Sequence, residues 1–173
     1  MSQWYMLTLV GEDRPGIVAK VTQVLYDGGC NLGEASMLRL GGAFTIMLMT
    51  QHNGPAESLE KLVAPVAQAM SLRTHVDHIE GKLHSHMEPD VRIALYGADR
   101  AGIVAKVTGL LAHAGLNILQ LESDVGGSEN DPIYIMQIEG VAAKGIDALS
   151  EAVSQIENEG IDIRISPIDT LIG

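Results

Sequence analysis

The chain has 173 residues, of which 46% are hydrophobic and 3% aromatic, and it carries a formal net charge of −11. This composition excludes a disordered chain, and the acidic balance argues against direct binding to nucleic acid, which needs clustered cations. Residues 1–86 contain 8 acidic and 6 basic residues, whereas residues 87–173 contain 14 and 5. The expected partners are small molecules or basic proteins, and an acidic surface that only maintains solubility explains the charge equally well.

No targeting or membrane segment is visible. The N-terminus lacks a basic region followed by a long apolar run, and no apolar run reaches the roughly 18 residues that a membrane span needs. We therefore expect a cytoplasmic protein without a membrane partner. Cys30 is the single cysteine, so neither an intramolecular disulfide nor a zinc site built from cysteines is expected. Its setting in the sequence shows no paired histidine or lysine that would mark a reactive thiol.

The chain contains an internal repeat. Residues 11–22 and 97–108 are identical at ten of twelve positions at a constant offset of 86. The same offset aligns the Gly-x-Asn turn at 29–31 with the one at 115–117. Self-similarity over this length predicts one module present twice. The predicted organisation is a first module at residues 1–80, a linker at 81–90 and a second module at 91–173.

In the first module the hydrophobic pattern alternates between strand and helix periods. The predicted elements are a strand at Trp4–Val10, a helix from Gly16 that ends at Gly28 and Gly29, strands at Leu32–Leu40 and Ala43–Thr50, a helix after Gly54 and Pro55, and a strand at Arg73–Ile79. Pro65 lies within the second helix and is expected to kink or split it.

The second module repeats this order with a longer polar loop at 126–132. Its predicted strands are Val91–Tyr96, Asn117–Val125, Ile133–Ile138 and Ile161–Ser166, and its predicted helices contain Ile103–Ala114 and Ile146–Ile156. A βαββαβ order predicts an α+β fold of ferredoxin-like type, with an antiparallel four-stranded sheet and both helices on one face.

The second face of each predicted sheet has no cover from its own module. Met47, Met49, Ile135 and Met136 indicate that part of this face is buried. The sheets would pair edge to edge or face to face, and we expect a homo-oligomer.

The first strand ends in a turn, Gly11–Gly16, that leads into a helix. Free amides at a helix start and the positive end of its dipole suit a carboxylate, while Asp13 would accept hydrogen bonds from an ammonium group. Asn31, at the start of the next strand, offers a donor and an acceptor to a ligand in its own module or in a neighbour. The structural alternatives are that Asp13 only caps the helix, that Asn31 is only a turn residue, and that Arg14 only forms a surface ion pair.

The Asp-Arg-Pro-Gly-Ile turn at 13–17, followed by Gly-Cys-Asn at 29–31, resembles the ACT domain, a sensing domain of amino-acid metabolism. The resemblance covers nearly the whole chain twice and implies ferredoxin-like modules that bind amino acids at domain interfaces. The implied ligand-binding residues are Asp13, Arg14, Gly16, Ile17 and Asn31, and in the second module Asp99, Arg100, Gly102, Ile103 and Asn117.

Two departures from the family pattern limit what the resemblance implies. Serine-sensing members often have asparagine where this chain has Asp13 and Asp99, so serine specificity is not carried over. Ala101 replaces the proline in the second turn. A chain of two such modules without a catalytic domain or helix-turn-helix resembles transcriptional regulators within this family. That resemblance, and not composition or spacing, implies a non-enzymatic repressor that acts through a DNA-binding partner protein, with glycine as the expected ligand.

Three other functions stay open at this point. The modules would serve as an adaptor that binds proteins without sensing a ligand. Arg14 and Asn31 would loosely suit a small ferredoxin-like hydrolase of acyl phosphates, although no catalytic arrangement stands out. A metal role would rest on the histidines at 75, 78, 84 and 86. The first two should point to opposite strand faces, whereas His84 and His86 in the linker could chelate or belong only to a solvated linker. No cofactor, metal or catalytic residue is predicted.

Overall fold

The structure is a computed structural model that describes residues 2–80, 87–98, 102–128, 131–157 and 160–168. The chain divides into two compact units, Met1–Leu83 and His84–Gly173, called module 1 and module 2 below. Each module is described separately. Within the described residues, no helix is both long and apolar enough to cross a membrane.

The order of elements in both modules is βαββαβ, as predicted. Module 1 contains β1 (Gln3–Glu12), α1 (Ile17–Asp27), β2 (Asn31–Leu40), β3 (Ala43–His52), α2 (Ala56–Ala69) and β4 (Arg73–His78). Module 2 contains β5 (Val91–Ala98), α3 (Ile103–His113), β6 (Leu116–Ser128), β7 (Asp131–Ala142), α4 (Ile146–Glu157) and β8 (Ile161–Pro167).

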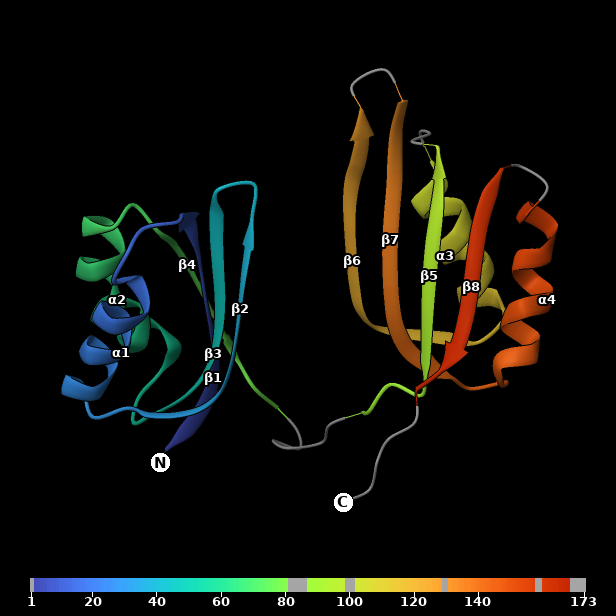
Figure 1. Cartoon of the computed structure of the whole chain (residues 1–173). Coiled ribbons are helices and arrows are strands. Elements are labelled where there is room, and N and C mark those ends of the chain that lie inside the picture. The colour runs from blue at the N-terminus through green and yellow to red at the C-terminus, as the bar shows by residue number, and fades with distance from the viewer. Residues whose placement is uncertain (1, 81–86, 99–101, 129–130, 158–159, 169–173) are drawn as a thin grey trace. The chain divides into compact units, whose positions relative to one another are not determined.

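Each module is an antiparallel four-stranded sheet with both helices on one face (Figure 1). The strand orders are β2-β3-β1-β4 and β6-β7-β5-β8, so β2 and β6 are edge strands. The predicted ferredoxin-like α+β fold is therefore confirmed. The hairpin at Gly41 and Gly42 has positive φ at both glycines, the conformation that a tight connection between twisted strands requires.

The cores form where alternate strand residues meet the apolar stripes of the helices. The fully buried aliphatic side chains of module 1 are Leu7, Leu9, Val21, Leu25, Leu59 and Val63, and those of module 2 are Val91, Leu95, Val107, Leu111 and Leu149. Burial of each such side chain stabilises the fold by about 1.5–3 kcal/mol relative to exposure, before the entropy of ordering is subtracted.

Two local predictions can be compared with the structure. Of the kink or split expected at Pro65, the split does not occur, because α2 runs from Ala56 to Ala69 with the proline inside it. The polar loop predicted at 126–132 is mostly strand, because β6 continues to Ser128, which pairs with Asp131. The composition of this segment is typical of a loop, but ladder pairing between β6 and β7 extends the hairpin through it.

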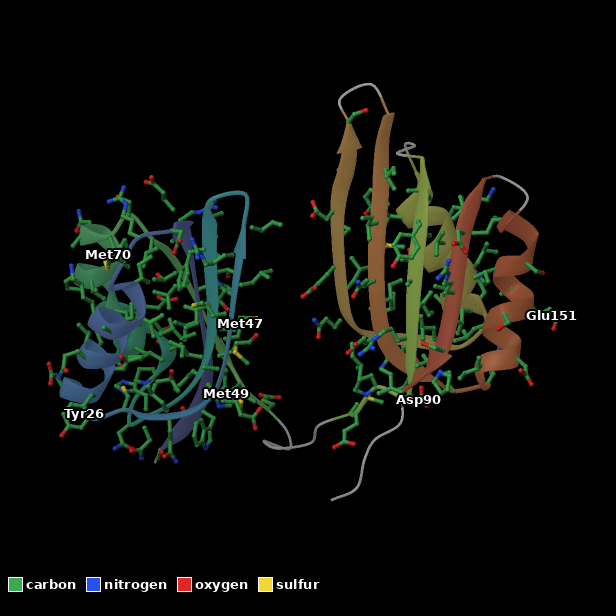
Figure 2. The ribbon with its side chains drawn as sticks, in the orientation of Figure 1. Tyr26, Met47, Met49, Met70, Asp90 and Glu151 are labelled. Atoms are coloured by element: carbon green, nitrogen blue, oxygen red, sulfur yellow. The ribbon has the colours of Figure 1, made fainter. Side chains whose placement is uncertain are left out.

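The sheet face that the helices leave open carries apolar residues in module 1. Met47 and Met49 project from β3 on the side away from α1 and α2, and Met47 is 45% exposed (Figure 2). The prediction for Met136 was wrong, because this side chain is 1% exposed within the core of module 2. Consecutive strand residues point to opposite faces, so Ile135 lies on the open face and Met136 on the helix-covered face.

Candidate functional site

The turn after β1 leads into α1 through a glycine with left-handed backbone. Gly16 is the N-cap residue of α1 with φ 85°, and no side chain caps the helix start. Asp13 is therefore not the N-cap, and Pro15 lies before the cap instead of at the first helical position. The first amides of α1 carry no side-chain partner at the cap, which is the arrangement that binds anions at helix N-termini.

Asp13 is fixed by two contacts at the end of the sheet. Its backbone N–H donates to the carbonyl of Gly42 at 3.0 Å, and its Oδ2 lies 2.5 Å from Nη2 of Arg39 on β2. The Asp13 side chain is 26% exposed. A ligand ammonium group that binds this carboxylate would compete with a guanidinium that is already in place.

Arg14 forms a surface ion pair, with 2.7 Å between its Nη2 and Oε2 of Glu12. The hydrogen bond from Arg14, and then its positive charge, lower the pKa of the Glu12 carboxyl from its ordinary value. The Ile17 side chain is 2% exposed within the core, so only its backbone can contact a ligand.

Module 2 repeats the start of the helix. Gly102 is the N-cap of α3 with φ 84° and no side-chain cap, and Ile103 behind it is 6% exposed. Asp99 and Arg100 lie outside the described residues.

Asn31 lies at the opposite end of the sheet from Asp13. In the strand register Asn31 faces Gln51, which faces Trp4 near the start of β1, whereas Asp13 follows the last residue of that strand. The nine residue-to-residue steps from Trp4 to Asp13 span roughly 30 Å at about 3.3 Å per step along a strand. The Asn31 amide donates to Oε1 of Gln51 at 3.1 Å. A single free amino acid therefore cannot contact Asp13 and Asn31 of the same module.

The same separation occurs in module 2. Asn117 pairs with Val141 beside the start of β5, whereas Gly102 follows the end of β5. The Asn117 amide nitrogen lies 3.6 Å from the Met87 sulfur. A Cβ added to Gly140 would lie 2.3 Å from the Asn117 carbonyl oxygen, so glycine is needed there for this strand approach.

Cys30 has a histidine partner that the sequence did not indicate. Its Sγ lies 3.4 Å from Nδ1 of His52, and Nε2 of His52 lies 2.7 Å from Oγ of Ser58. Because Ser58 donates to the Pro55 carbonyl, the hydrogen bonds are consistent when Nε2 of His52 carries the proton and Nδ1 accepts from the thiol. Cys30 is 7% exposed, and burial raises the pKa of its thiol, so the thiol is held neutral.

His75 and His78 of β4 have separate partners. His75 lies 3.1 Å from Asp77, and His78 makes an edge contact with the Tyr5 ring at 5.5 Å between centroids. His84 and His86 lie outside the described residues. Within the described part of the chain, no three His, Cys, Asp or Glu residues are grouped as metal ligands. A groove of about 480 Å³ on the helical side of module 1 contains none of the predicted ligand residues; it is lined by Ala19, Lys20, Gln23, Val24 and Val66.

Each module combines a βαββαβ fold with a first helix that starts at a left-handed glycine. Comparison with known proteins shows which family has this combination. Residues 4–77, most of module 1, match the ACT domain family model, so module 1 is an ACT domain, as predicted, and the chain forms two tandem ferredoxin-like modules. The glycine cleavage system transcriptional repressor of Escherichia coli (strain K12) is 26% identical over 156 residues, which cover 89% of this chain and 82% of that protein. The UPF0237 protein YjhC of Lactococcus lactis is 31% identical over 74 residues, which cover 42% of this chain and 85% of that protein.

Solved structures share the fold. A protein of unknown function from Galdieria sulphuraria has a TM-score of 0.77 at 22% identity and covers 98% of this chain and 100% of its own. A candidate glycine cleavage system transcriptional repressor has a TM-score of 0.71 at 20% identity, with 98% and 99% of the two chains covered. At these identities the likeness shows the fold alone.

Proposed function

We propose that this protein is a non-enzymatic regulator that senses a small amino acid, with glycine as its ligand. The single observation that carries the proposal is the repeated helix start at Gly16 and Gly102, where uncapped amides suit the ligand carboxylate. In module 1 the Asp13 carboxylate lies in the turn just before these amides and would accept the ligand ammonium group. Amide donors and one carboxylate acceptor together match the two charged ends of a free amino acid.

The site would be completed by a second copy of the chain. Asn31 is at the opposite end of its own sheet, so it would meet the Asp13 turn of another copy. The edge strand β2 is exposed along all ten residues and offers its backbone for pairing. Two β2 strands paired antiparallel about a two-fold axis bring the Asn31 end of one strand to the Leu40 end of the other. Leu40 lies beside the Asp13 turn, so each ligand would contact two chains.

The homology supports a regulatory role. The Escherichia coli relative described above, which matches 89% of this chain, is a transcriptional repressor of the glycine cleavage system. We propose the same role here, with repression exerted through a DNA-binding partner protein, since the net charge of −11 disfavours direct contact with DNA. Ligand would act by favouring one assembled arrangement and so changing the surface that the partner meets.

Thermal unfolding of the full chain with each free amino acid at millimolar concentration tests the sensing step. A ligand at about a hundred times its dissociation constant stabilises the folded state by roughly 2.7 kcal/mol. We expect a selective shift with glycine that is lost in Asp13→Ala and kept in Asp27→Ala, which removes an exposed carboxylate at the far end of α1. If no amino acid shifts the transition, the protein is an adaptor without a ligand.

The regulatory step has its own test. Deletion of the gene should raise transcription of the glycine cleavage genes, and the purified chain alone should leave their promoter DNA unshifted in an electrophoretic assay. Unchanged transcription would contradict the repressor role while leaving ligand sensing intact.

A further inference from the structure

The internal repeat allows equivalent positions of the two modules to be compared. A residue type on the open face of module 1 that module 2 lacks at the matching position is not required by the fold. Leu7 pairs with Leu48 in the core of module 1, and Ile93 pairs with Ile138 at the matching position of module 2. The residue pairs on either side of Leu7–Leu48 therefore correspond to the pairs on either side of Ile93–Ile138, and all of these flanking pairs point to the open face. They can be compared position by position.

At the first open-face position the two modules differ in polarity. Module 1 pairs Met6 with Met49 across β1 and β3. Module 2 pairs Arg92 with Glu139 across β5 and β7, with 2.7 Å between Nη2 and Oε1. The fold thus accepts a solvated ion pair here. Two methionines at this position are not required by the core beneath them.

One neighbouring position shows the same contrast, since Met47, paired with Thr8, corresponds to Gln137, paired with Ala94. Val10, paired with Thr45, corresponds to Tyr96, paired with Ile135, so this position is apolar in both modules. Trp4 lies further along β1, where its ring passes so close to Gly33 that a Cβ on the glycine would be 2.9 Å away. Together with Val10, these residues form the apolar face of module 1: Trp4, Met6, Val10, Met47 and Met49.

We propose that the apolar face of module 1 packs against the same face of a second copy of this chain. An apolar sheet face of this kind lies about 10 Å from the sheet that covers it, and methionine side chains adapt to the opposing surface. The face carries no charged residue, so it offers nothing specific to a strongly charged partner. An identical face offers the matching apolar surface in an isologous contact.

The charges at the border of this face also complement themselves. The β4 row on the open side carries Arg73 in register with Val10, His75 in register with Thr8 and Asp77 in register with Met6, and His75 lies 3.1 Å from Asp77. When two copies face each other with strand directions opposed, Arg73 of one lies over Asp77 of the other. The overall charge favours the same contact, because residues 1–86 contain only two more acidic than basic residues, against nine more in residues 87–173.

The test transfers the module 2 pair into module 1. Met6→Arg combined with Met49→Glu reproduces the ion pair that the sister module already carries, so the variant should fold. Light scattering of the full-length protein should give at least twice the 18.4 kDa chain mass for the wild type and half the wild-type mass for the variant. Tyr26→Gln, which removes an exposed apolar residue on the helical side, should leave the mass unchanged.

Trp4 is the single tryptophan and reports on the same contact. Its emission should move to longer wavelength on dilution of the wild type, and the variant should show the long-wavelength emission at every concentration. Equal masses for wild type and variant, including a monomeric wild type, would overturn the proposal. Because the contact does not use the β2 edge, a glycine-induced thermal shift should persist in the variant, which separates this proposal from the ligand site.

Discussion

Arg39 of β2 and Asp13 of the turn after β1 form an ion pair at one end of the module 1 sheet, with 2.5 Å between Nη2 and Oδ2. The pair connects the edge strand to the turn in which the ligand would bind. The Arg39 side chain is 67% exposed, so the pair is solvated and contributes little to stability. Its main consequence is that the Asp13 carboxylate already has a cationic partner.

Arg39→Ala should therefore strengthen binding of an amino acid whose ammonium group meets Asp13. An exposed ion pair is worth about 0.2–1 kcal/mol, so the affinity should rise by up to about fivefold. Isothermal titration calorimetry with glycine measures this change. Arg164→Ala removes a comparable exposed pair with Asp162 in module 2 and should leave the affinity unchanged. Weaker binding in Arg39→Ala would show that the guanidinium holds the ligand instead.

Gly16→Ala should destabilise module 1 by about 1–2 kcal/mol, because alanine disfavours a left-handed backbone. A Cβ at Gly16 meets no atom within 4 Å, so the penalty is conformational and not steric. Gly109→Ala is the matched control, since Gly109 lies inside α3 with equally open surroundings and alanine should stabilise the helix by up to about 1 kcal/mol. Urea unfolding of the two variants should show opposite signs. The same sign would mean that α1 does not start at a left-handed residue.

The buried thiol of Cys30 predicts that the free energy of unfolding depends on pH in the alkaline range. Burial raises its folded-state pKa above the ordinary value of 9.0, so the neutral thiol is favoured by folding. The resulting stability is present below pH 9 and is lost as pH rises through the folded-state pKa. In urea unfolding measured from pH 8 to 10.5, the free energy of unfolding should fall more steeply with rising pH in the wild type than in Cys30→Ala. Parallel curves would contradict this description of the thiol.

The contact between Cys30 and His52 illustrates what sequence reasoning missed. The residues are 22 apart along the chain, and the turn that contains Cys30 shows no histidine nearby. The hydrogen bonds to His52 arise because β3 ends beside the start of β2. The repeat contains a signal that could have revealed the contact. The positions in module 2 that match Cys30 and His52 are Leu116 and Ala142, which pair with each other and are both apolar. The polar pair is thus an addition that the fold does not need.

The sequence by itself determined the duplication, the βαββαβ order, the family and the glycine at each helix start. These features depend on local patterns, namely hydrophobic period, turn chemistry and self-similarity, which a one-dimensional sequence preserves. Only the tertiary structure decided that Asp13 pairs with Arg39, that Asn31 lies at the far end of the sheet, and that Met136 belongs to the core. Strand register and the choice of sheet face are set by pairing between distant segments, and a one-residue change in register moves every side chain to the opposite face.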